Sequence, residues 1–68
     1  MTYKNMKIEI NAEQPLDEAV KELERLGFRV GFYSEYPKSI ETYSDGEFDM
    51  YCFRQPADTT LKQLREMK

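Results

Sequence analysis

The stretch IETYSDGEFDMYCF, residues 40–53, alternates apolar and polar side chains on both sides of Ser44-Asp45-Gly46. Alternation with a period of two is typical of strands, and a short loop that ends in glycine is typical of a β-hairpin. The hairpin register decides which side chains face the core, because a slip of one residue turns every side chain to the other face. Residues 40–53 therefore decide the fold.

Two loop lengths are compatible with this hairpin, and they predict different cores. A two-residue loop would bring Glu41 onto the apolar face. A three-residue loop with Gly46 in a left-handed conformation instead pairs Thr42 with Phe48, and we expect this register because it buries no carboxylate. One face of the hairpin then carries Ile40, Thr42, Phe48, Met50 and Cys52. Cys52 is thus expected to be a buried packing residue.

Upstream of the hairpin, apolar residues recur at helical spacing and form one stripe: Leu16, Ala19, Val20, Leu23 and Leu26. Pro15 suits the first helical turn, where its missing N–H is harmless, and Gly27 suits the position after the last turn. From Phe28 onward the period changes to two. We expect Phe28, Val30 and Phe32 on one side of a strand that follows the helix.

The two ends of the chain add one strand and one helix. Alternation predicts a first strand whose buried side carries Met6, Ile8 and Ile10. Residues 36–39, Tyr-Pro-Lys-Ser, are typical of a turn with proline at its second position. After Pro56, a closing helix can be capped by Asp58, Thr59 or Thr60, and Thr60 with Gln63 has the spacing of a capping box. The apolar stripe of that helix is Leu61, Leu64 and Met67.

These elements predict a single small domain over residues 1–68, of the α+β class, with the order β-α-β-β-β-α. Both helical stripes need an apolar surface to cover them. We therefore expect a largely antiparallel sheet with both helices packed on one face.

Composition excludes several kinds of chemistry. The chain has 68 residues, 10 basic and 13 acidic, with no histidine, no tryptophan and one cysteine. Without histidine the usual general base and the commonest transition-metal ligand are missing, and one cysteine forms neither an intrachain disulfide nor a multi-cysteine zinc site. We expect no enzymatic activity, no catalytic residue, no metal and no cofactor. No apolar run is long enough for a membrane span and the N-terminus lacks a signal-peptide pattern, so we expect no membrane association and a cytoplasmic location.

The sheet face that the helices leave uncovered is expected to combine aromatic and acidic side chains. We predict that it binds a partner through Tyr33, Glu41, Tyr43, Glu47, Asp49, Tyr51 and Phe53, with Glu35 beside them. Tyrosine is enriched at interfaces because it buries a large area and keeps a polar tip. The carboxylates disfavour direct binding of nucleic acid and favour a protein with a basic surface. The alternative is that these tyrosines are only good strand formers on a solvated surface.

Four segments together resemble small accessory proteins encoded by tailed bacteriophages. They are the strand Lys7-Ile8-Glu9-Ile10, the helix end Glu24-Arg25-Leu26-Gly27-Phe28, the aromatic strands around Asp45-Gly46, and the closing residues 60–67. The resemblance spans most of the chain and carries no catalytic residues. It implies a non-enzymatic protein that binds and disables a host or defence factor.

The alternative prediction is a different class of function for the same face. The face would pair with the same face of a second copy in a homodimer that completes a marginal core, or it would enclose a small ligand between two protomers. The sequence leaves the choice between these functions and partner binding open.

Overall fold

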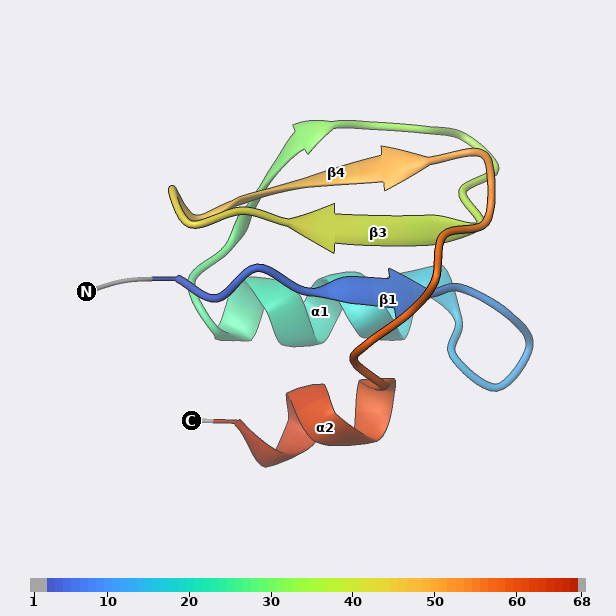
Figure 1. Ribbon diagram of the computed structural model, residues 1–68. Coiled ribbons are helices and arrows are strands. Elements are labelled where there is room, and N and C mark those ends of the chain that lie inside the picture. The colour runs from blue at the N-terminus through green and yellow to red at the C-terminus, as the bar shows by residue number, and fades with distance from the viewer. Residues whose placement is uncertain (1–2, 68) are drawn as a thin grey trace.

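In a computed structural model, residues 3–67 are described and form six elements in the expected order (Figure 1). They are β1 (Lys7–Glu9), α1 (Leu16–Arg25), β2 (Arg29–Phe32), β3 (Ser39–Thr42), β4 (Glu47–Tyr51) and α2 (Leu61–Glu66). The strands form one sheet in the order β1-β3-β4-β2. The two helices lie together on one side of this sheet, which confirms the α+β class and the predicted arrangement of layers.

The sheet is mixed, so the expectation of a largely antiparallel sheet is wrong for one pair. β3 is antiparallel to both β1 and β4, whereas β2 runs parallel to β4. The reason is that α1 acts as a crossover connection: it carries the chain from β1 to the far edge, and the β3–β4 hairpin fills the space between the two outer strands.

The connection from β2 to β3 must therefore pass the end of β4, and it is not a tight hairpin turn at residues 36–39. The chain bends at Glu35, Tyr36 and Lys38, and Ser39 already pairs with Tyr51 as part of β3. The main-chain N–H of Lys38 also donates to the Tyr51 carbonyl at 2.7 Å. Strand pairing thus begins where the sequence pattern predicted the turn to end.

The hairpin register is the predicted one. Thr42 lies opposite Phe48, and the loop is closed by a hydrogen bond from the Tyr43 N–H to the Glu47 carbonyl at 2.9 Å. Gly46 has a φ of +90°, the left-handed conformation that the three-residue loop requires. This register places Ile40, Thr42, Phe48 and Met50 in the interior.

One continuous core joins the inner sheet face to both helices. Its buried members are Met6, Ile8, Ala19, Leu23, Phe28, Ile40, Phe48, Met50, Leu61 and Leu64. After α1, the N–H of Phe28 donates to the Leu23 carbonyl at 3.0 Å, so the chain turns at Gly27 and folds Phe28 back onto the core, as predicted.

Two predictions drawn from alternation are wrong. Phe28 is buried, but Val30 and Phe32 do not share one side of the strand: the pairing with β4 shifts by one residue between them, so that Val30 lies opposite Phe48 and Phe32 opposite Asp49. Both are exposed, at 46% and 61%, because β2 is an outer strand and contributes nothing to the core. Cys52 is exposed, because β4 ends at Tyr51 and the inward–outward alternation ends with it. Its predicted role in core packing does not hold.

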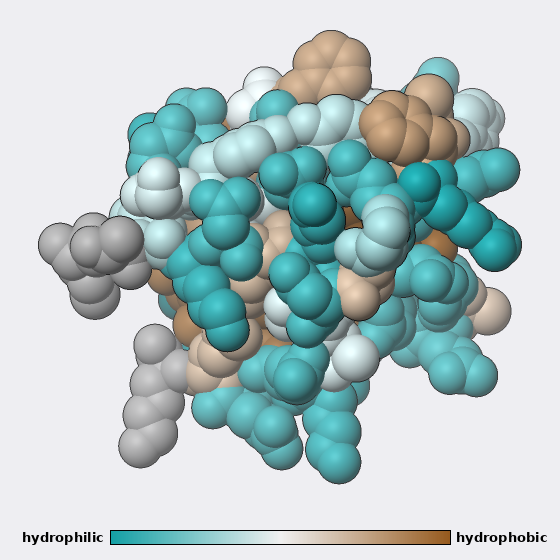
Figure 2. Space-filling model, viewed as in Figure 1, coloured by the Kyte–Doolittle hydropathy of each residue, from teal (hydrophilic) through white to brown (hydrophobic). Residues whose placement is uncertain are grey.

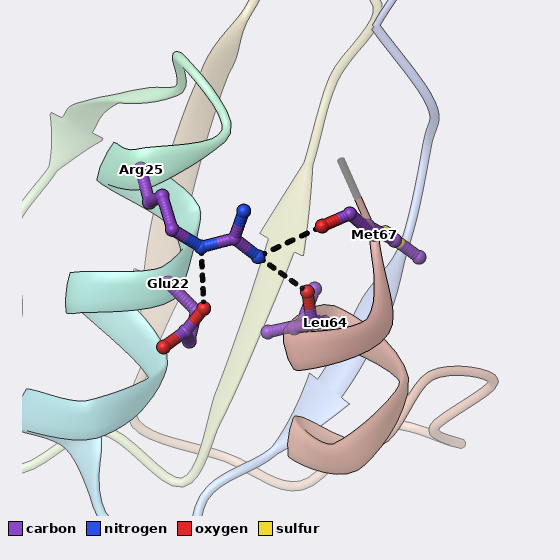
Figure 3. Close-up of polar contacts among 4 residues, drawn as sticks. All are labelled: Glu22, Arg25, Leu64 and Met67. Carbon is purple, nitrogen blue, oxygen red and sulfur yellow. Dashed lines mark hydrogen bonds and ion pairs between the residues drawn. The ribbon is translucent and has the colours of Figure 1, made fainter.

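The two helices are joined at their C-terminal ends by Arg25 of α1 (Figure 3). Its guanidinium Nη2 donates to the main-chain carbonyls of Leu64 and Met67 at 2.9 and 3.0 Å, while Nε donates to Glu22 at 2.7 Å. Because the last carbonyls of a helix lack partners within it, this arginine serves as the C-terminal cap of α2. At its other end α2 begins with the predicted capping box of Thr60 and Gln63.

Replacing Gly46 with alanine tests the loop. A Cβ there would be strained at positive φ and would lie 2.8 Å from the Cε2 atom of Tyr3, so we expect a loss of about 1–2 kcal/mol in the free energy of unfolding. Denaturant unfolding measures it. The exposed loop neighbour Ser44→Ala should change stability by less than about 0.5 kcal/mol, and equal effects of both substitutions would contradict this account.

Replacing Arg25 with methionine tests the helix junction. Methionine keeps an apolar chain but removes both bonds to the α2 carbonyls, so we expect about 1–2 kcal/mol of destabilisation and faster amide exchange in α2 than in the sheet. The matched control is Arg65→Met, which removes only the exposed pair with Glu18 and should cost well under about 1 kcal/mol. Equal protection of α2 in both variants would count against the cap.

Candidate protein-binding face

The sheet face opposite the helices is built from alternate residues of the strands, and we call it the tyrosine face. It consists of the strand residues Lys7, Glu9, Arg29, Glu41, Glu47, Asp49 and Tyr51, together with Tyr43, which follows β3 directly and donates its main-chain N–H to the Glu47 carbonyl. Five of the seven predicted site residues, Glu41, Tyr43, Glu47, Asp49 and Tyr51, lie on it together and are partly buried. The hairpin register that buries Phe48 and Met50 necessarily turns these five to the other side.

Tyr43 and Tyr51 contact each other through their hydroxyl groups, whose oxygens are 2.5 Å apart. Tyr43 lies at the loop end of β3, and Tyr51 lies at the far end of β4, opposite Ser39. The cross-strand pair of Glu41 and Asp49 lies between them. The two aromatic side chains therefore extend along the sheet toward each other, over these carboxylates, instead of projecting separately into solvent.

This arrangement raises the pKa of the Tyr43 hydroxyl far above its ordinary value. The largest cause is the hydrogen bond with Tyr51; partial burial and the negative charges of Glu41 and Asp49 act in the same direction, since all disfavour a phenolate. The Tyr43 hydroxyl thus stays protonated and can donate a hydrogen bond over the whole physiological range.

Asp49 has a structural role that sequence reasoning missed. Its Oδ1 atom accepts a hydrogen bond from the main-chain N–H of Phe32 at 2.9 Å, at the point where the pairing of β2 with β4 shifts by one residue. A Cβ atom on Gly31 would lie only 2.7 Å from the same oxygen. The carboxylate of Asp49 therefore occupies the space that Gly31 leaves and holds the irregular part of β2 against β4. The one sequence signal for this role of Asp49 was a glycine, Gly31, inside a strand.

The cations of the face lie toward its margins. Lys7 is opposite Glu41 across the β1–β3 pair. Arg29 is opposite Glu47, with 3.5 Å between its Nη2 and the Glu47 Oε2, in a solvent-exposed ion pair. The carboxylates of Glu41, Asp49 and Glu47 occupy the two central strands between these cations, so the middle of the face is acidic.

Tyr33 and Phe53 lie outside the strands, and the prediction that strand alternation places them on the face is wrong. β2 ends at Phe32 and β4 at Tyr51, because the chain leaves the sheet there. Phe53 still adjoins the face, since its ring centroid is 5.3 Å from that of Tyr51. Tyr33 is 66% exposed in the connection to β3, which also contains Glu35.

Residues 3–67 show no gathering of three or more histidine, cysteine, aspartate or glutamate side chains able to hold a metal ion. Among the helices of these residues, none has the length and apolar character needed to cross a bilayer. The tyrosine face is a surface of aromatic rings among carboxylates.

Searches of protein-family models, of curated proteins and of solved structures found no match to this chain.

Replacing Tyr51 with phenylalanine tests the hydroxyl pair. In the folded protein the pKa of Tyr43 lies above 10.0, its ordinary value, so the stability it contributes is complete below pH 10.0 and is lost as the pH rises further. Without the Tyr51 hydroxyl the pKa of Tyr43 should fall toward the ordinary value, and the alkaline loss should be smaller. Unfolding free energies at about pH 8 and about pH 11 measure this difference. Tyr36→Phe, on a side chain that is 80% exposed, should behave as wild type; an identical alkaline loss in Tyr51→Phe would argue against the pair.

Proposed function

We propose that this protein is a non-enzymatic binding module that docks the tyrosine face onto a basic surface of a protein partner. The observation that carries the proposal is the pair of Tyr43 and Tyr51, held together over the acidic centre of the face. Their rings are already partly immobilised in the free protein, so docking costs less side-chain entropy than ordering two free tyrosines would.

Each type of residue on the face has a distinct role in this proposal. Tyr43 and Tyr51 are the anchors that lose their remaining exposure to water, and Phe53 extends the aromatic surface beyond Tyr51. Glu41 and Glu47 supply the charge that attracts lysine and arginine side chains of the partner. Asp49 acts indirectly, because its hydrogen bond to Phe32 shapes the surface beside these groups.

The acidic centre also supports a protein partner over a nucleic acid. Aromatic sheet surfaces that stack bases lie in positive potential, because neutralising phosphates supplies much of the affinity. The resemblance to accessory proteins of tailed bacteriophages supports a host or defence factor as the partner, and inhibition of that factor as the outcome. The exposed, unpaired Cys52 suits a reducing compartment such as the cytoplasm.

Affinity capture from a bacterial lysate with the immobilised protein tests the proposal. We expect a basic protein to be retained by the wild type and to be lost with the double variant Tyr43→Ala, Tyr51→Ala, since alanine removes both anchors. Binding should weaken as the salt concentration rises, and Glu41→Gln with Glu47→Gln should reduce that salt dependence.

The matched control is the double variant Lys21→Ala, Glu24→Ala, which changes two exposed residues of α1 on the other side of the sheet. It should retain the partner as the wild type does. Circular dichroism confirms that each variant is folded. Equal retention by the folded tyrosine double variant would reject the proposal, as would loss of the partner in the α1 control alone.

A further inference from the structure

The two edges of the sheet differ in whether another segment of the chain covers them. The outer edge of β1 is covered by residues 58–59: the N–H groups of Asp58 and Thr59 donate to the Lys7 carbonyl, and the Asp58 carboxylate accepts from the Lys7 N–H at 2.9 Å. Thr59 also forms a parallel bridge with Ile8. β2 is the last strand on the other side, and within residues 3–67 no strand pairs with its outer edge. An uncovered edge is a template for pairing with another chain.

The side chains along this edge are exposed, and those of Val30 and Phe32 are apolar. All four residues of β2 are exposed, including Val30 and Phe32, and Tyr33 follows them directly. In Figure 2 a hydrophobic side chain protrudes at the top of the view, above β2, whereas hydrophilic side chains dominate most of the visible surface. Covering this edge would remove apolar area from water.

The main-chain groups of Val30 are directed toward the open edge. Arg29 donates its N–H inward, to the Gly46 carbonyl at 2.9 Å. Successive residues of a strand direct their N–H and C=O groups to alternate sides. The N–H and C=O of Val30 therefore point away from β4 and are available to an added strand.

Gly31 has no side chain that could cover the carboxylates beside it on the side of the tyrosine face. The position of a Cβ atom there would be 2.7 Å from Asp49 Oδ1 and 3.1 Å from Glu47 Oε1. Both carboxylates can thus be approached across Gly31 from outside the sheet. If an added strand placed a cationic side chain opposite Gly31, the charged group of that side chain would contact both carboxylates.

We propose that the occupant of this edge is a second copy of the chain, paired β2 to β2 in antiparallel orientation about a two-fold axis at Val30. In that register the two Val30 residues exchange main-chain hydrogen bonds, and their side chains lie together on the helix side of the sheet. Arg29 of each copy lies opposite Gly31 of the other, with its guanidinium directed at Glu47 and Asp49. Because the dimer has two-fold symmetry, the contact of Arg29 with Glu47 and Asp49 forms twice, once from each copy.

Charge complementarity is what selects a second copy. β2 supplies both halves of the contact: the cation at Arg29, and at Gly31 a position with no side chain beside the carboxylates of Asp49 and Glu47. The two positions are two residues apart, as the symmetric register requires. The arginine has 64% of its side chain exposed and is 3.5 Å from its own Glu47, so it can turn toward a neighbour. The irregularity after Val30 keeps the paired segment short, and the dimer is accordingly weak and concentration-dependent. This dimer does not rest on the proposed partner-binding function, because it forms through the outer edge of β2 and leaves the tyrosine face uncovered.

Sedimentation equilibrium over about 10 µM to 1 mM, a range suited to a small interface, tests the pairing. The wild type should show a monomer–dimer equilibrium. Arg29→Glu should weaken it at least about tenfold, because each contact changes from attraction to repulsion, and Glu47→Arg should weaken it likewise. An equimolar mixture of the two variants should dimerise again, since both contacts then join opposite charges.

Two controls separate this dimer from others. Lys62→Glu makes the same charge change on the exposed side of α2 and should leave dimerisation as in wild type. The double variant Tyr43→Ala, Tyr51→Ala should also still dimerise, which separates edge pairing from pairing through the tyrosine face. A wild type that is monomeric throughout the range, a mixture that stays monomeric, or a dimer lost with the tyrosines would each overturn the proposal.

Discussion

The hydrogen bond that closes the loop between Tyr43 and Glu47, with Gly46 at positive φ, sets the register of the two central strands. Everything on either side of the sheet depends on that register. On one side it presents Ile40, Phe48 and their neighbours to both helices, and on the other it brings Tyr43 and Tyr51 over Glu41 and Asp49. A slip of one residue would bury carboxylates and separate the hydroxyl pair, so core and candidate site are specified together.

The outer strands show a second constraint, the need to manage sheet edges in so small a protein. β1 is closed by the chain's own Asp58 and Thr59, and the same segment leads into α2, whose last carbonyls are capped by Arg25. Within residues 3–67, β2 has only β4 beside it, and Asp49 holds its irregular end. The fold thus leaves one apolar edge and one acidic aromatic face, two surfaces of different chemistry on one sheet.

Much of the fold could be predicted from local patterns. The α1 stripe, the capping box at Thr60 and the glycine loop are short-range signals, and all were confirmed. The parallel placement of β2 could not be predicted, because strand pairing depends on how α1 carries the chain across the hairpin. The exposure of Val30 and Cys52 could not be predicted for a similar reason. Alternation indicates which residues share a side of a strand, but it does not indicate where the strand ends or whether another element covers that side.

For the candidate site, the hairpin pattern determined that Glu41, Tyr43, Glu47, Asp49 and Tyr51 share a face, because side-chain direction in a strand has a period of two. Only the tertiary structure decided what they do there. The meeting of the two hydroxyls, the bond of Asp49 to Phe32 and the open edge at β2 are contacts between side chains or strands distant along the chain. Such contacts depend on the distances between packed elements, and a one-dimensional pattern does not contain those distances.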